Sequence, residues 1–238
     1  MSQTETQVLK YKLDVTSDVW DREYSTCKVI PSSTRTLPSK ALVLFSELIG
    51  FHTGLKVLDA GCGIGRNSVY LAQKGCEVHA VDFSEIALKT LDELASQAGV
   101  RENIKPYNWA LEESFPFENN SFDLVLDSYV FCHFTDNNLK QYYRDELHRV
   151  TKSGGVVFSS LFSVEDEYYA ELIDQSNVES RVVVDPNNGI TKQLYTEEEI
   201  KSLFSKKFNI LYFVEFQFQD VVLGKPYRRN IFALVLKK

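Results

Sequence analysis

The chain has few cysteines, no long apolar run and no stretch rich in proline, glycine and serine. Its four cysteines among 238 residues, Cys27, Cys62, Cys76 and Cys132, are widely spaced and form no CxxC pair. This spacing disfavours a disulfide framework and a zinc site, and it indicates a reducing compartment. No apolar run approaches the roughly 18 residues that span a bilayer, and the first residues lack a signal-peptide core. We therefore expect a cytoplasmic protein without membrane segments or a metal site.

Basic residues are also in the minority. Lysine and arginine number 26 against 33 acidic residues, giving a formal net charge of −7. Broad nucleic-acid binding is disfavoured because each phosphate contact needs a basic side chain. The cluster of Lys225, Arg228 and Arg229 is too short for a nucleic-acid surface, and we expect it to temper an acidic surface. The length, with 44% hydrophobic residues, predicts one large domain, with or without a lid.

Strand-like and helix-like segments alternate through the middle of the chain. Apolar residues at helical spacing and a terminal Gly50 predict a helix within 38–50. Five strand-like runs follow, at 55–60, 76–83, 103–108, 121–128 and 154–162. Helical patterns separate the first pairs, and another precedes the fifth strand. This alternation predicts right-handed βαβ units and a parallel sheet with helices on both faces.

The end of the chain has a different pattern. Thr196 and Glu199 form a capping box that opens a helix, and β-rich runs at 210–218 and 229–237 predict an antiparallel hairpin. We therefore predict an α/β, doubly wound, mostly parallel seven-stranded sheet. Residues 1–37 would form an arm or lid and 38–238 the main domain. Residues 163–195, rich in acids and tyrosines, would form a lid insertion at the sheet's carboxyl edge.

The main chemical signal is a glycine loop directly after the first strand. The stretch 57–66 reads VLDAGCGIGR, and such a loop lets a ligand approach the backbone closely before a helix N-terminus. A dinucleotide fingerprint would need a third glycine where Arg66 stands. Asp59 at the mouth of the loop suits a cation better than a pyrophosphate. Asp82, at the end of the second strand, is placed to accept hydrogen bonds from ribose hydroxyls.

The segment VLDAGCGIGRNSVYLAQKGCEVHAVDFS resembles the class I S-adenosylmethionine-dependent methyltransferases. The later segments FPFENNSFDLVLDS and ELHRVTKSGGVVFSS, followed by the terminal hairpin, occur in the order that this family shows. The resemblance covers about 57–162 and the last strands, and it implies a Rossmann-like fold. WDREY together with GRNSVYLA is similar to the small-molecule branch related to the tellurite-resistance and thiopurine methyltransferases.

The resemblance also implies roles for individual residues. It assigns the methionine part of the cofactor to the glycine loop, the ribose to Asp82 and the adenine side to Phe83. The family commonly has an acid after the third strand, which this chain lacks at the expected place. The adenine contact is therefore left to the backbone of Ala110 and Leu111, or to Glu112. The remaining cofactor candidates are Asp59, Gly61, Gly63, Gly65, Asp127 and Ser128.

The candidate acceptor residues have alternative interpretations. His133 and Tyr129, just after the fourth strand, are the catalytic candidates, although His133 could be a packing residue of the wall. Trp20 and Tyr24 could cover the site by cation–π contact or fill a satellite core. Arg35 could bind a substrate carboxylate or face solvent. The acids at 165–167, with two tyrosines, could attract a cationic substrate or form a solvated helix face.

These observations predict an S-adenosylmethionine-dependent methyltransferase with a small-molecule acceptor. In-line displacement from a sulfonium needs alignment and exclusion of water, and a general base only where the nucleophile carries a proton. The alternatives are methylation of tRNA or protein, and cofactor binding without turnover. A nicotinamide oxidoreductase is disfavoured by Arg66. The sequence indicates neither the acceptor nor the oligomeric state.

Overall fold

A single seven-stranded sheet forms the centre of the molecule. The computed structural model describes residues 16–173 and 180–238, and its strand order is β3-β2-β1-β4-β5-β9-β8. Only β9 runs antiparallel to its neighbours β5 and β8. This confirms the predicted doubly wound sheet with a terminal hairpin. The strands are β1 Lys56–Ala60, β2 Glu77–Asp82, β3 Ile104–Asn108, β4 Phe122–Ser128, β5 Thr151–Phe162, β8 Asn209–Val222 and β9 Lys225–Lys237.

The major helices begin and end at residues that suit helix termini. Ser84 and Asp136 accept backbone hydrogen bonds at the start of α4 and α5. Thr196 and Glu199 form the predicted capping box of α7. Gly50 ends α2 in the left-handed conformation. The helices are α2 Lys40–Ile49, α3 Arg66–Gln73, α4 Glu85–Gln97, α5 Asn137–Val150 and α7 Glu197–Phe204.

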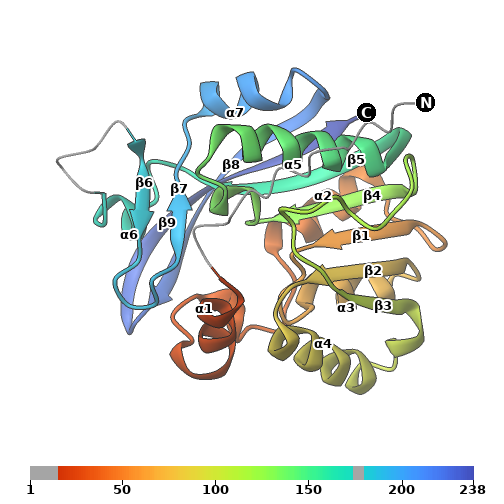
Figure 1. The fold of residues 1–238 in the computed structure, drawn as a ribbon, viewed down its shortest axis with the longest axis horizontal. Helices are drawn as coiled ribbons and strands as arrows, with labels where there is room; N and C mark the ends of the chain where they lie inside the picture. The colour runs from red at the N-terminus through yellow and green to blue at the C-terminus, as the bar shows by residue number, and fades with distance from the viewer. Residues whose placement is uncertain (1–15, 174–179) are drawn as a thin grey trace, which may run out of the picture.

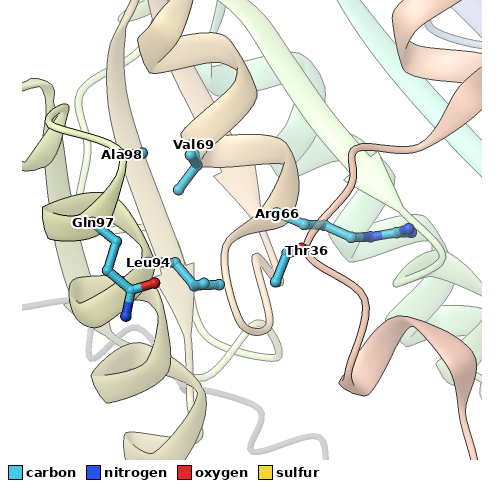
Figure 2. Close-up of a pocket in the computed structure, with 6 residues that line it drawn as sticks. All are labelled: Thr36, Arg66, Val69, Leu94, Gln97 and Ala98. Atoms are coloured by element: carbon cyan, nitrogen blue, oxygen red, sulfur yellow. The ribbon is translucent and has the colours of Figure 1, made fainter.

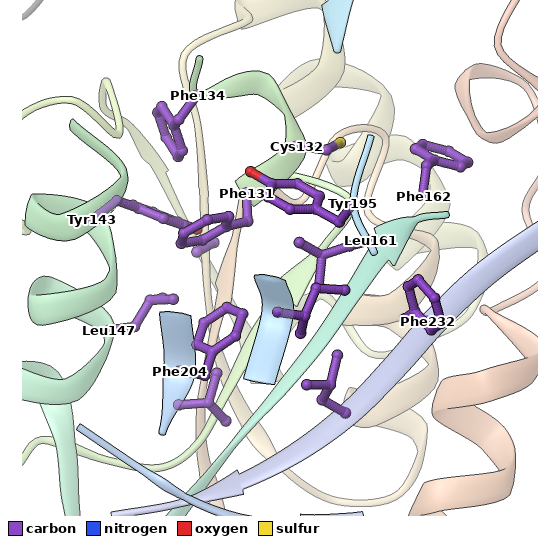
Figure 3. Packing of buried hydrophobic residues seen from close by; sticks show 14 of the residues in the cluster. Phe131, Cys132, Phe134, Tyr143, Leu147, Leu161, Phe162, Tyr195, Phe204 and Phe232 are labelled. Atoms are coloured by element: carbon purple, nitrogen blue, oxygen red, sulfur yellow. The ribbon is translucent and has the colours of Figure 1, made fainter. Parts of the chain in front are cut away.

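Each face of the sheet is covered by helices and has its own core. Leu42 and Phe45 of α2, together with buried residues of α3 and α4, pack on one face. On the other face, α5 and α7 enclose a cluster rich in aromatic residues (Figure 3). The rings of Phe134 and Tyr143 lie 4.5 Å apart within it. A strand buried on both faces has no polar alternation, which is why β1 and β4 read as apolar runs.

Two peripheral segments lie beyond the carboxyl ends of the parallel strands (Figure 1). One contains α1 Ser17–Arg22 and the short turns η1 Glu23–Cys27 and η2 Pro31–Ser33. The other contains α6 Glu167–Ala170 and an antiparallel pair, β6 Val182–Val184 and β7 Thr191–Gln193.

The two peripheral segments contact each other directly. Glu23 Oε2 accepts a hydrogen bond from Asn188 Nδ2 at 3.1 Å, and Arg22 Nη2 donates to the Asn188 carbonyl at 2.9 Å. Parts of the predicted arm (1–15) and of the insertion (174–179) lie outside the described residues. Within the described ranges, no helix combines the length and apolar character needed to cross a bilayer.

Candidate cofactor and substrate site

The glycine loop follows β1 at the point where the order of the sheet reverses. β1 pairs in parallel with β2 on one side and with β4 on the other. From β1 the chain continues through β2 to β3 at one edge of the sheet, and it then returns to β4 on the other side of β1. This reversal opens a crevice beyond the carboxyl ends of β1 and β4. Ala60 is level with Val81 of β2 and with Asp127 of β4. The sheet thus brings the ends of three strands around one loop.

Within the loop, Gly63 and Gly65 have different structural roles. Both have positive φ angles, 55° and 82°. The backbone N–H of Gly63 donates to Asp82 Oδ2 at 2.8 Å, which ties the loop to the end of β2. A Cβ on Gly65 would lie 1.9 Å from Leu91 Cδ1, because α3 and α4 pack closely there. The geometry therefore assigns Gly65 to helix packing as well as to the turn.

Two acids flank this loop, and both are buried. Asp82 Oδ1 accepts from the Ser84 N–H at 3.0 Å, and Asp59 Oδ2 accepts from Ser68 Oγ at 2.6 Å. Desolvation raises the pKa of each carboxyl from 3.8 to about 6, and Asp82 also raises that of Asp59. A cationic or hydroxyl-rich ligand would favour the ionised forms of both.

The candidate adenine side adjoins the loop. Leu111 Cδ1 lies 3.4 Å from where a Cβ on Gly61 would stand. Phe83, directly after β2, and Ala110, directly before Leu111, are both half-buried. Glu112 Oε2 is buried and has no hydrogen-bond partner in the described part of the chain. Of the two adenine contacts considered, Glu112 is thus the one with an unsatisfied acceptor.

The two cofactor candidates at the end of β4, Asp127 and Ser128, have different surroundings. Asp127 is fully buried, and its carboxyl oxygens accept from the Phe131 N–H at 2.9 Å and Ser159 Oγ at 2.5 Å. The carboxylate therefore holds the turn η4 Phe131–His133 against β5. Ser128 Oγ, in contrast, is buried without a partner among the described residues.

Tyr129 follows immediately in a left-handed conformation. Its φ angle is 67°, which is unusual for a residue other than glycine and turns the chain sharply after β4. The ring stacks on Phe162 with the centroids 4.8 Å apart. Burial raises the pKa of Tyr129 to about 12, so the hydroxyl keeps its proton at neutral pH.

His133 lies where the arm and the insertion meet. Its Nδ1 is 2.9 Å from the Thr191 carbonyl oxygen, and its ring packs edge-on to Trp20 at 5.1 Å. A carbonyl only accepts, so Nδ1 carries the hydrogen and Nε2 keeps a lone pair. Burial, and secondarily Lys192, lowers the pKa of His133 to about 3. The imidazole is therefore neutral and a weak base.

The aromatic residues of the arm lie beside the glycine loop. Trp20 and Tyr24 stack with their centroids 5.5 Å apart, and the Tyr24 hydroxyl is 2.9 Å from where a Cβ on Gly63 would stand. Trp20 also packs on a small cluster of Ile30 and Ile190. Both interpretations thus apply in part, because Tyr24 contacts the loop while Trp20 also fills a satellite core.

Arg35 is held elsewhere, on the terminal hairpin. Its guanidinium donates to both carboxyl oxygens of Asp220 in β8, and nearly half of the Arg35 side chain remains exposed. The structure thus gives Arg35 a protein carboxylate as its partner and does not bring it to the group around His133.

Two surface predictions were wrong for one residue each, Asp166 and Arg229, whereas the other charged members of both groups are exposed as predicted. Asp166 is fully buried and Arg229 is only 3% exposed, and Arg229 Nε donates to Asp166 Oδ2 at 2.8 Å. The guanidinium also lies 5.1 Å from the ring centre of Tyr169. Acids and bases far apart in sequence form this buried pair, so sequence spacing alone could not indicate it.

Lys192 of β7 is a further buried charge that its sequence pattern did not indicate. Lys192 is 2% exposed, and its Nζ lies 5.2 Å from the Tyr169 ring centre. The available signal was a lysine in the stretch GITKQLY with the apolar residues Ile190 and Leu194 two positions away on either side. A similar pattern occurs in many exposed edge strands, so the signal does not indicate burial.

A small groove of about 230 Å³ lies between α3 and α4 (Figure 2). Leu94 and Gln97 line it, whereas the Arg66 side chain extends away from them. None of the cofactor or substrate candidates lines this groove. In the described ranges, no group of three or more metal-ligating side chains comes together.

Comparison with known proteins agrees with this geometry. A family described as methyltransferase domain matches residues 57–155. An uncharacterized methyltransferase of Synechocystis sp. is 32% identical over 58% of this chain, and the match spans 63% of that protein. TehB from Haemophilus influenzae has a TM-score of 0.62 at 19% identity, with 84% of this chain and 62% of that chain covered.

A third similar protein was crystallised with ligands. The 1,6-didemethyltoxoflavin-N1-methyltransferase of Burkholderia thailandensis, with bound 1,6-didemethyltoxoflavin and S-adenosylhomocysteine, has a TM-score of 0.67 at 17% identity. The similarity covers 97% of this chain and 94% of that chain. At this identity it demonstrates the shared fold.

Residues 57–155 therefore match a methyltransferase domain, and the sheet has the Rossmann-like fold of solved S-adenosylmethionine-dependent methyltransferases. The glycine loop, β2 and β4 all lie within the matched residues 57–155. The arm and the insertion at 163–195, which approach the loop from outside, lie beyond them.

Proposed function

We propose that this chain is an S-adenosylmethionine-dependent methyltransferase whose acceptor is a small molecule. The observation that carries the proposal is the hydrogen bond between Asp82 and the Gly63 N–H, with Asp59 buried beside it. It joins a glycine loop and two acids at the switch point of the sheet, where an open α/β sheet binds its ligand.

The residues present fit this cofactor. Asp82 accepts two backbone N–H groups, and a carboxylate has about four acceptor positions, so two remain for ribose hydroxyls. Glu112 has an unsatisfied acceptor suited to an amino group. Asp59 adds negative charge near a bound sulfonium. Tyr24 and Val130 lie against the loop and would flank the cofactor.

S-adenosylmethionine supplies an electrophilic methyl group, so this chain's task is to align the acceptor and exclude water. Trp20 and Tyr24 cover the loop from the arm, while Tyr129 and Phe162 form an aromatic wall at the ends of β4 and β5. His133 Nε2 can accept a hydrogen bond from the molecule that receives the methyl group. With its low pKa, His133 orients the acceptor better than it removes a proton.

A small acceptor suits the enclosure of this site by two peripheral segments. The chain's net charge of −7 opposes the phosphate contacts that a tRNA substrate would need. The similarly folded Burkholderia enzyme is named for a small heterocyclic substrate. These observations favour a small molecule over tRNA or protein.

Two measurements test the proposal. The melting temperature should rise with S-adenosylmethionine and stay unchanged with NAD, and a rise with NAD alone would contradict the cofactor. A radiolabelled methyl group should then enter the small-molecule fraction of a cell extract. Label in RNA or protein would contradict the acceptor class, and cofactor binding without any label would indicate a binding protein.

A further inference from the structure

Lys192 of β7 is a buried cation beside η4 and α6. It is 2% exposed, and its Nζ has no hydrogen-bond partner among the described residues. His133, on one side, bonds to the carbonyl of the residue before it. Tyr169, on another, presents its ring 5.2 Å from Nζ. Burial lowers the pKa of Lys192 to about 8, so the ammonium form still predominates at neutral pH.

Asp185 and Glu23 act electrostatically on Lys192, and Asp166 acts on the neighbouring Tyr169. All three acids already accept hydrogen bonds from other residues. Asp185 accepts from Tyr168 OH at 2.6 Å and from the side chain of Asn187. Asp166 accepts from Arg229 Nε at 2.8 Å.

Glu23, the third acid, accepts from the Ile30 N–H at 2.7 Å, Ser33 Oγ and Asn188 Nδ2. Each of the three acids thus already accepts hydrogen bonds from residues other than Lys192. A buried charge with neither counter-ion nor hydrogen bond is unfavourable, and proteins retain one chiefly where a ligand supplies the missing partner.

An aromatic wall begins at Tyr169, beside Lys192. The rings of Tyr169, Phe162 and Tyr129 form a continuous wall, with centroids 4.7 and 4.8 Å apart at its two contacts. Arg229 Nη2 is also buried and without a partner in the described ranges, and its guanidinium lies 5.1 Å from the ring centre of Tyr169 and 5.3 Å from that of Phe162. The wall is therefore aromatic, and two buried cationic donors, Lys192 Nζ and Arg229 Nη2, lie beside it.

We propose that the methyl acceptor is a small, flat molecule carrying an anionic oxygen, a carboxylate or a phenolate, that accepts a hydrogen bond from Lys192 Nζ against the Tyr129–Phe162–Tyr169 wall. This assignment of substrate class rests on the proposed methyltransferase function, whereas the anion site itself does not. It differs from the sequence-based alternative in which the acids at 165–167 attract a cationic substrate, because the buried member, Asp166, is already paired with Arg229.

The test compares aromatic acids with their amides of the same shape. The probes are benzoate and benzamide, phenylacetate and phenylacetamide, and indole-3-acetate and indole-3-acetamide. Binding is measured by ligand-detected NMR and titration calorimetry, with and without S-adenosylhomocysteine. A charge-assisted hydrogen bond in a desolvated site should make an acid bind about tenfold or more tightly than its amide. Equal binding of both members of every pair, or no binding of any acid, overturns the proposal.

Substitutions assign the preference to Lys192. Lys192→Met keeps an unbranched side chain one atom shorter and should abolish the acid preference, whereas Lys192→Arg should retain it. The matched control is Lys140→Met, because Lys140 is also buried and lies over a tyrosine ring, but donates to Gln193 Oε1. Circular dichroism verifies that each variant is folded. An acid preference that survives in Lys192→Met overturns the proposal.

The cofactor titration separates this proposal from the proposed function. If acids bind through Lys192 but the protein does not bind S-adenosylhomocysteine, the anion site stands and the methyltransferase function falls. If the cofactor binds and the acids show no dependence on Lys192, the function stands and the acceptor class falls.

Discussion

The carboxylate of Asp82 accepts the backbone N–H of Gly63 at 2.8 Å, across the gap between the end of β2 and the glycine loop. Its other oxygen accepts the N–H of Ser84, the N-cap of α4. A single side chain therefore orients the loop and the helix that follows β2. Whatever binds at this edge meets a carboxylate whose position is already set by two backbone donors.

Replacement of Asp82 by asparagine should weaken S-adenosylmethionine binding. The amide keeps the size but loses the charge and one acceptor oxygen, so hydrogen bonds to the ribose are lost. Hydrogen bonds to charged groups contribute about 1.5–3 kcal/mol, which corresponds to a roughly 10- to 100-fold rise in Kd. Calorimetric titration measures it. Asp123→Asn is a suitable control, because Asp123 also accepts a backbone N–H, from Lys56; equal affinities in the two variants would contradict the ribose role.

Acidification should change stability and cofactor affinity in opposite directions. The pKa values of Asp59 and Asp82 are raised from 3.8 to about 6 on folding, so the folded state binds more protons than the unfolded state between these values. These groups therefore stabilise the free protein as the pH falls from about 6 to 4. The cofactor prefers the ionised acids, so its affinity should fall over the same range.

Thermal unfolding and calorimetry between pH 4.5 and 8 measure these two effects. The Asp59→Asn and Asp82→Asn variants should each show a shallower dependence of cofactor affinity on pH. An affinity that stays constant in the wild-type protein below pH 6 would refute the assignment of these acids to the cofactor.

Gly65→Ala should destabilise the protein more than Gly50→Ala. Both glycines have positive φ, 82° and 75°, so alanine costs about 1–2 kcal/mol at either position. At Gly65 the new Cβ also meets Leu91 Cδ1 at 1.9 Å, whereas nothing lies within 4 Å at Gly50. Overpacking adds about 1–3 kcal/mol. Urea unfolding measures the difference, and equal losses would show that α4 moves away freely.

Asp166→Asn should be strongly destabilising. It leaves Arg229 as an uncompensated charge in a site where both residues are buried, and the loss of one partner of such a pair costs about 3–5 kcal/mol. The control is Asp92→Asn, which breaks an exposed pair with Arg101 and should cost less than about 1 kcal/mol. Chemical unfolding of both variants provides the comparison. A loss for Asp166→Asn as small as the control's would mean that Arg229 finds another partner.

His133→Gln should lower the turnover without changing its pH dependence. Burial keeps the pKa of His133 near 3, so the imidazole does not titrate between pH 6 and 8. Methyl transfer by the wild-type protein and by the variant, at saturating cofactor, should have the same pH profile over this range. A step near pH 6.5 that the variant lacks would instead identify His133 as a general base.

Much of the fold was predictable because its signals are local. Runs such as 55–60 and 121–128 are apolar because both faces of β1 and β4 are buried, and Thr196 with Glu199 specifies a helix start within four residues. Strand alternation and right-handed crossovers then restrict the strand order to few topologies. The structure confirms both the parallel sheet and the terminal hairpin.

The cofactor half of the site was partly predictable for the same reason. Asp59 and the glycines occupy one short loop, so their proximity follows from the sequence. The chemical state of Asp127 did not follow, because its partners Ser159 and Phe131 come from another strand and a later turn. A carboxylate at a strand end can face either side, and only the packing shows which.

The sequence by itself determined that this chain builds a doubly wound sheet with a glycine loop between Asp59 and Asp82, since each of those features is written in contiguous residues. The tertiary structure alone decided that Asp166 and Arg229 are buried together and that Lys192 Nζ has no hydrogen-bond partner among the described residues. These outcomes depend on contacts across long sequence separations, where the burial and pairing of a charge are set by the elements that pack around it.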